Sequence, residues 1–93
     1  MEEIIIYQNE ELYYRMIPGD IDSYTTFERV TALVKDCRVI GVKFEKAYDS
    51  EELIECKPDE IMCQENAKKI ICEKLKNLMI QLIILKKTSN ERT

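Results

Sequence analysis

The last third of the chain carries apolar residues at alternating spacings of three and four positions. The residues in this register are Ile71, Leu75, Leu78, Leu82 and Leu85. This spacing is typical of a helix with one apolar face that packs against a neighbouring surface. Because no glycine or proline follows Pro58, we predict one helix from Pro58 to Lys87. It would be about 45 Å long at 1.5 Å per residue, with the proline at its first position.

The end of this predicted helix, residues 78–85, is apolar at nearly every position. A helix of that kind must be buried on all sides, and a chain of 93 residues offers little surface to bury it. We therefore expect a contact with a second copy of the chain, as a two-fold dimer. The expected contact residues are Leu78, Leu82, Ile83 and Leu85. A β-strand over residues 78–86 is the alternative, because short apolar runs rich in isoleucine also suit strands.

Apolar and aromatic residues dominate two short segments near the start of the chain. We predict strands over residues 3–7 and 12–17, joined as a hairpin by the polar turn 8–10. In the second strand Leu12, Tyr14 and Met16 share one face, so we expect at least one face of this strand to pack on a core. Pro18 and Gly19 then end the strand.

The middle of the chain contains one ambiguous segment and one clear strand. Thr25 and Glu28 have the spacing of a capping box, which predicts a helix over residues 26–36, although the β-branched residues there also favour a strand over 29–34. Residues 38–46 alternate in polarity and predict a half-buried strand, with a bulge at Gly41. A short helical turn through Cys56 is expected to precede the long helix.

These elements predict an α+β fold. The order β-β-α-β-α gives a small two-layer domain, in which the helices, including the long C-terminal one, cover one face of an antiparallel or mixed sheet. The domain is expected to span residues 1–87, and the polar segment 88–93 is expected to be disordered.

The net charge of −4 is unevenly distributed along the chain. Residues 1–60 hold 7 basic and 15 acidic side chains, a net charge of −8, whereas residues 61–93 hold 7 basic and 3 acidic side chains, a net charge of +4. An acidic body joined to a basic helix can steer charged partners.

Most catalytic and metal-binding chemistry lacks its usual residues. The chain has no histidine for a Ser-His or Cys-His pair, and its two glycines do not form a phosphate-binding loop. The four cysteines lack the paired spacing of a zinc site, so we expect reduced thiols in the cytoplasm. The acidic start and the shortness of the apolar runs predict neither a signal peptide nor a membrane span. We expect no enzyme activity, cofactor or bound metal.

The acidic half of the chain predicts binding to a partner protein with a basic surface, through long-range steering and carboxylate pairing with Lys or Arg. Tyrosines, which are enriched at interfaces, would anchor the contact. The candidate residues are Glu2, Glu3, Glu10, Glu11, Tyr13, Asp20, Asp22, Tyr24, Asp49, Glu51 and Glu52. The corresponding role is a small regulator or inhibitor, such as an immunity protein, an antitoxin or a nucleic-acid mimic of a phage or other mobile element.

Two other functions fit parts of the sequence. In the first, the lysines of the C-terminal helix contact phosphates and the chain is a dimeric nucleic-acid-binding protein. Direct nucleic-acid binding is not favoured, because such domains are usually basic overall and the isoelectric point here is about 4.9. In the second, the apolar end of the helix makes the chain a structural subunit of a larger assembly.

Overall fold

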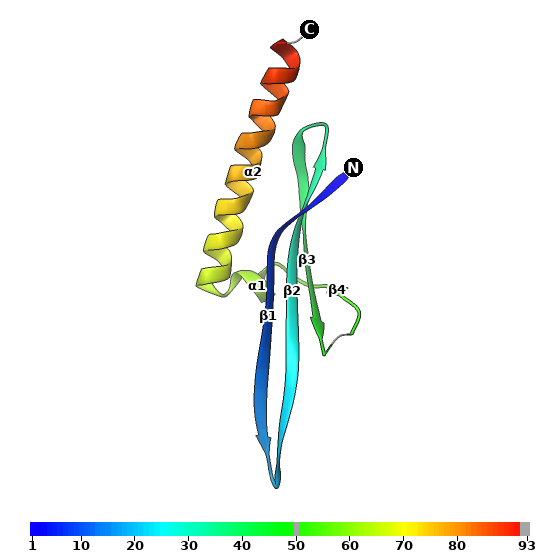
Figure 1. Ribbon diagram of the computed structural model, residues 1–93, viewed down its shortest axis with the longest axis vertical. Coiled ribbons are helices and arrows are strands. Elements are labelled where there is room, and N and C mark those ends of the chain that lie inside the picture. Colours follow the sequence, from blue (N-terminus) through cyan, green and yellow to red (C-terminus); the bar gives the residue numbers. More distant parts are fainter. Residues whose placement is uncertain (50, 92–93) are drawn as a thin grey trace.

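Four antiparallel strands form one sheet, and two helices lie against one of its faces, as the computed structural model in Figure 1 shows. The structure describes residues 1–49 and 51–91, with the backbone alone for 88–91. The strands lie across the sheet in the order β1 (Glu2–Ile17), β2 (Asp20–Lys35), β3 (Arg38–Tyr48) and β4 (Ile54–Glu55). The helices are α1 (Asp59–Met62) and α2 (Glu65–Glu91). The predicted α+β class is confirmed.

The segment 26–36 is strand up to Lys35, so the helix predicted there and the order β-β-α-β-α are wrong. β2 pairs with β1 along its whole length and with β3 from Thr26 onward. Val30, Ala32 and Val34 are buried at alternate positions, as a central strand requires. The β-branched residues and the pairing on both edges of β2 outweigh the local capping signal.

β1 runs without a turn from Glu2 to Ile17, so the hairpin turn predicted at residues 8–10 is wrong. Its register with β2 shifts once, between Ile5 and Tyr7, and then continues to the end of the strand. The chain turns at residues 18–19 instead. Gly19 has a φ of 83°, which glycine adopts without steric strain because it has no side chain. β1 is an edge strand, so the polar side chains of residues 8–10 can reach solvent.

The predicted helix over 58–87 is two helices, because α1 ends at Met62 and α2 begins at Glu65, with a bend at Gln64 between them. Pro58 occupies the position just before α1. Residues 78–86 are helical, as predicted, and the alternative strand is excluded. The helical turn predicted before Cys56 is wrong, since the short strand β4 lies there and pairs with β3. α2 continues to Glu91, within the segment expected to be disordered, and residues 92–93 lie outside the described residues.

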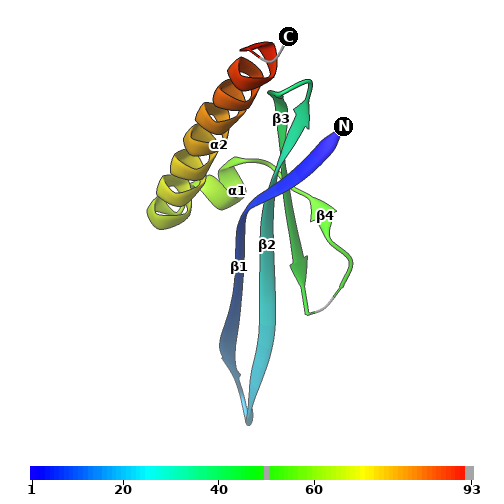
Figure 2. The same cartoon turned by 45° about the horizontal axis from the view of Figure 1, so that its top comes forward.

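One apolar core joins the helices to the sheet. The buried residues of this core are Ile6, Tyr7, Val30, Ala32, Phe44, Ile61, Ala67 and Ile71. Figure 2 shows α1 and α2 on the same side of the strands, with α1 near the start of α2. The predicted bulge is confirmed, because the register between β2 and β3 shifts at Leu33 and Val34, opposite Gly41 and Val39.

The molecule is elongated, with extents of 70 × 25 × 18 Å. Its radius of gyration is 17.6 Å, whereas a compact domain of this length has about 12 Å. Pairing between β2 and β3 begins at Thr26, so residues 12–25 of β1 and β2 pair only with each other. This two-stranded segment, which we call the ribbon, extends from the sheet at the end opposite the C-terminus (Figure 1).

Candidate protein-binding surface

The strand register sorts the acidic candidates onto the two faces of the sheet. Val30 and Ala32 of β2 face the helices, so Phe27, Arg29, Thr31 and Leu33 face the opposite side, which we call the open face. Cross-strand pairing places further residues on the open face: Glu3, Glu10, Lys43, Glu45, Ala47 and Glu55. The open face is therefore rich in carboxylates.

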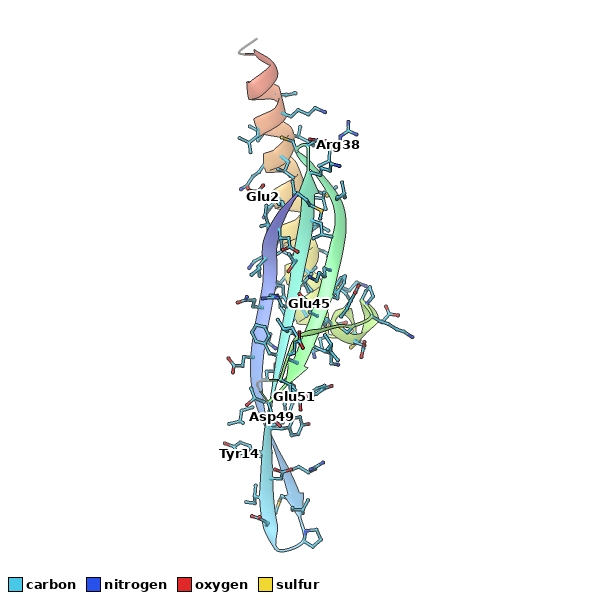
Figure 3. The ribbon with its side chains drawn as sticks, turned by 90° about the vertical axis from the view of Figure 1, so that its right-hand side faces the viewer. Glu2, Tyr14, Arg38, Glu45, Asp49 and Glu51 are labelled. Carbon is cyan, nitrogen blue, oxygen red and sulfur yellow. The ribbon has the colours of Figure 1, made fainter. Side chains whose placement is uncertain are left out.

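An acidic hollow lies on the open face where the ribbon leaves the sheet. Its volume is about 280 Å³, and its lining residues are Glu10, Thr25, Phe27, Ala47, Asp49, Glu51 and Leu53. Figure 3 shows Asp49 and Glu51 close together at this level. The structure thus brings three of the predicted site residues to one place. The sequence does not indicate the apolar residues Phe27, Ala47 and Leu53 of this site, because its pattern predicts a helix at residue 27 and a helical turn at residue 53.

Backbone hydrogen bonds hold the carboxylate of Asp49 and the backbone of Glu51 at this hollow. The backbone N–H of Thr25 donates to Oδ1 of Asp49 at 2.8 Å, and the backbone N–H of Asp49 donates to the carbonyl of Thr25, also at 2.8 Å. The N–H of Glu51 donates to the carbonyl of Tyr48 at 2.9 Å. Asp49 has a φ of 47°, in a region that aspartate tolerates better than most residues. These hydrogen bonds therefore hold Asp49 by its side chain and backbone, and Glu51 by its backbone.

A chain of ion pairs crosses the open face above the acidic hollow. The side chain of Glu45 is 9% exposed and lies 3.2 Å from Nη2 of Arg29 and 3.8 Å from Nζ of Lys43. Lys43 also lies 3.9 Å from Glu3. These ion pairs contain the cations Arg29 and Lys43, and Lys35 and Arg38 pair with each other at the far end of the same two strands. Six carboxylates lie around the ion pairs and the hollow. The six carboxylates belong to Glu3, Glu10, Glu45, Asp49, Glu51 and Glu55.

A second group of predicted residues lies on the helix side of the ribbon. The rings of Tyr13 and Tyr24 stack with centroids 5.4 Å apart, and the Tyr13 hydroxyl donates to Glu11. This hydrogen bond, with one from Asn9, lowers the pKa of Glu11. Arg15 and Asp22 form an exposed ion pair at 2.7 Å. Because this group faces away from the open face, the predicted site is divided between two surfaces.

The three remaining candidates belong to neither group. Glu2 pairs with Val34 near the start of β1, and Asp20 accepts the backbone N–H of Ile21 at 2.7 Å beside the hairpin turn. Glu52 is exposed in the segment before β4.

The helix side also has a hollow of about 180 Å³, between the root of the ribbon and the start of the helices. Its lining residues are Tyr13, Tyr24, Thr26, Glu28, Lys46, Tyr48, Glu60 and Gln64. Sequence reasoning missed Glu28, which is buried, and Lys46, which lies 3.5 Å from Glu60 and over the ring of Tyr48. The local pattern around Glu28 gives no sign of its burial, because that burial comes from the pairing of β2 with both neighbours.

We expect Glu28→Gln to raise the free energy of unfolding at pH 7. Burial raises the pKa of the Glu28 carboxyl; the charge of Lys46 opposes the rise, and that of Glu11 adds to it. A carboxyl whose pKa is raised in the folded state lowers the free energy of unfolding as the pH rises through that pKa, because the charged form is disfavoured in the folded protein. The gain from glutamine should therefore disappear below the unfolded-state pKa of about 4.3. Urea denaturation at pH 7 and pH 3.5 measures this difference.

Glu73→Gln on α2 is the matched control, since Glu73 is exposed and removal of its charge should leave both free energies nearly unchanged. A loss of stability in Glu28→Gln at pH 7 would show that pairing with Lys46 outweighs the desolvation of the carboxylate.

The described residues contain no cluster of three or more Cys, Asp or Glu side chains that could hold a metal ion. Cys37, Cys56, Cys63 and Cys72 are all free thiols. Within the described part of the chain, no helix has the length and apolarity needed to cross a membrane. Comparison with known protein families, curated proteins and solved structures found no match to this chain.

Proposed function

We propose that this chain is a small protein-binding module that acts without catalysis and takes a basic surface of a partner protein on its open face. The observation that carries the proposal is the acidic hollow, in which Glu10, Asp49 and Glu51 surround an apolar floor. Lys and Arg side chains combine an apolar stem with a charged head. A hollow with an apolar floor and acidic rim suits both parts of such a side chain.

The surroundings of the hollow support the same chemistry. The carboxylates of Glu3 and Glu55 lie farther along the open face, so a partner with several basic groups would meet further acidic positions beyond the hollow. An excess of carboxylates steers an oppositely charged partner into contact. The module would act as a regulator or inhibitor by covering the basic surface through which its partner works, for example a nucleic-acid-binding channel. The free thiols favour a reducing, cytoplasmic location for this activity.

The test is capture of proteins from nuclease-treated lysate of the native host, with the tagged chain and with a variant carrying Glu10→Gln, Asp49→Asn and Glu51→Gln. Asparagine at position 49 keeps the oxygen that accepts the N–H of Thr25. The loss of three charge pairs worth about 0.5 to 1 kcal/mol each should weaken binding of the captured protein about 10- to 100-fold.

A control variant loses the same three charges elsewhere, through Asp59→Asn, Glu65→Gln and Glu73→Gln, which are all exposed on the helices. We expect it to retain the partner as the unchanged chain does. Equal retention by all three proteins, or capture that disappears with nuclease treatment, contradicts the proposal.

A further inference from the structure

The open face continues from the acidic hollow onto the ribbon, where its large side chains are apolar. The residues of this ribbon stripe are Leu12, Tyr14, Met16 and Ile21, which are 56%, 70%, 83% and 60% exposed. The first three alternate along β1 in step with Glu10 of the open face, and Ile21 pairs directly with Met16. Tyr13 and Ile17 on the other face are exposed too, so the predicted packing of this strand on the core is wrong.

The ribbon stripe begins at the edge of the acidic hollow. Leu12 pairs directly with Thr25, which lines the hollow and donates its backbone N–H to Asp49. Leu12 also follows Glu10 on the same face of β1. In Figure 3 the labelled Tyr14 lies just below Asp49. The charged residues that line the hollow are all acidic, so the open face changes from acidic to apolar along the ribbon.

The charges of the ribbon lie on its other face. Arg15 pairs with Asp22, and Asp20 pairs with Ile17, at positions that alternate with those of the stripe. The open-face positions of the ribbon are uncharged, and they are Leu12, Tyr14, Met16, Ile21, Ser23 and Thr25. A partner that covers the stripe therefore needs an apolar surface there, and its basic groups belong at the hollow.

The end of α2 also exposes apolar residues, but it lies on the other side of the sheet. Ile83 and Leu85 are both 59% exposed, whereas Leu82 is buried and Leu78 is half-buried, so two of the four predicted dimer contacts are already packed. Lys86 lines a hollow here with two other basic residues. This end of the molecule does not suit the basic partner of the open face, and the predicted two-fold dimer stays a prediction.

A helix suits the ribbon stripe better than an extended segment does. The backbone groups between the two strands pair with each other along the ribbon, so its face presents side chains. An extended segment laid on that face would leave its own backbone groups unpaired, whereas a helix pairs its backbone internally. Glu10 and Met16 are six positions apart in one strand, which is about 20 Å, and a helix of about 13 residues spans that length.

We infer that the basic partner of the open face docks an amphipathic helix along the ribbon, with Lys or Arg at one end of the helix in the acidic hollow and its apolar face on the ribbon stripe. The inference rests on the proposed function, because the basic end of the helix uses the same hollow. Apolar residues of the helix at spacings of three and four contact Leu12, Tyr14 and Met16 in turn. The helix also supplies packing to a two-stranded hairpin, which is marginally stable without it.

Fluorescence anisotropy with labelled synthetic peptides tests the contact on the full-length chain. The probes are two helix-forming peptides of 16 residues, with leucines three and four positions apart on one face and two arginines in the first turn or in the last turn. At least one should bind. A third peptide of the same composition, with the leucines spread around the helix, should bind at least tenfold more weakly.

Variants of the chain locate the two halves of the contact. Tyr14→Ser with Met16→Ser should weaken peptide binding at least tenfold, and so should the variant with the three substitutions in the acidic hollow described above. The matched control, Ile40→Ser with Ile80→Ser, removes apolar side chains that are 55% and 47% exposed elsewhere on the molecule and should bind as the unchanged chain does. All the substituted stripe and control residues are exposed, so circular dichroism should show an unchanged fold.

The outcomes separate this inference from the proposed function. Failure of both probes to bind, or binding that survives Tyr14→Ser with Met16→Ser, overturns the inference. Binding that depends on the hollow but not on the stripe overturns it too, and leaves the proposed function standing; binding that depends on the stripe alone overturns it because the basic end is then not in the hollow. Capture from lysate that ignores the hollow contradicts the proposed function whatever the peptides do.

Sedimentation equilibrium examines a second copy of the chain as the other occupant of the stripe. A dimer of the unchanged chain that dissociates in Tyr14→Ser with Met16→Ser would mean that a second copy covers the stripe, and it overturns the inference. A monomer, or a dimer that this variant retains, agrees with a stripe left open for the partner's helix.

Discussion

Ile71→Ala is expected to lower the free energy of unfolding by about 2 to 5 kcal/mol. Ile71 is 2% exposed and belongs to the core between α2 and the sheet. Alanine would remove apolar contacts and leave a cavity that the surrounding strands and helix can fill only in part. For a chain of this length the total is about 5 to 14 kcal/mol, so much of it would be lost. Urea denaturation followed by circular dichroism measures the change.

Ile70→Ala is the matched control, because it removes the same atoms one position earlier in the same helix. Ile70 is 41% exposed, so its replacement should change the free energy of unfolding by less than about 1 kcal/mol. Equal losses in the two variants would mean that α2 does not pack through the face containing Ile71.

The packing face of α2 could be predicted from the sequence, because apolar residues three or four positions apart lie on the same side of a helix. Ile71 and Leu82 are buried, and Leu75 and Leu78 are half-buried. The sequence could not show how far the sheet extends beneath the helix. A compact body would leave Leu78 and Leu82 overhanging, whereas the end of the sheet at the β2–β3 turn reaches along α2 as far as Leu82, which lies beside Arg38 and Val39.

The wrong prediction of a helix over residues 26–36, where the structure has β2, has a different cause. Thr25 and Glu28 match a capping box, which is a local signal, whereas the strand is stabilised by neighbours distant in sequence. The misplaced turn at residues 8–10 shows the same limit. Those polar residues look like a turn locally, but the long strand continues through them to Pro18 and Gly19.

The acidic character of the candidate site could be predicted from composition, but its geometry could not. Whether Glu10 and Glu11 share a surface depends on the register of β1, and the two side chains prove to face opposite sides of the sheet. The convergence of Glu10 with Asp49 and Glu51 depends on the pairing of β1, β2 and β3, which brings residues about 40 positions apart to one hollow. The ion pairs of the buried Glu45 depend on the same pairing.

The double variant Arg29→Met with Lys43→Met is expected to lose about 3 to 5 kcal/mol of the free energy of unfolding at pH 7, the range for a buried charge left without its partner. The Glu45 side chain is 9% exposed and has these two cations within 3.8 Å. Methionine keeps much of the apolar stem of both side chains, so the loss should come from the unpaired carboxylate. Urea denaturation at pH 7 measures the loss.

Adding Glu45→Gln to the double variant should restore more than half of the loss, because the neutral amide is much less costly to bury than an unpaired carboxylate. Arg15→Met is the exposed counterpart: in its pair with Asp22 the side chains are 66% and 45% exposed, so its loss should stay below about 1 kcal/mol. If glutamine at position 45 restores nothing, the loss comes from packing of the two basic side chains and not from charge. Recovery would instead show that Arg29 and Lys43 serve to neutralise the Glu45 carboxylate of their own sheet.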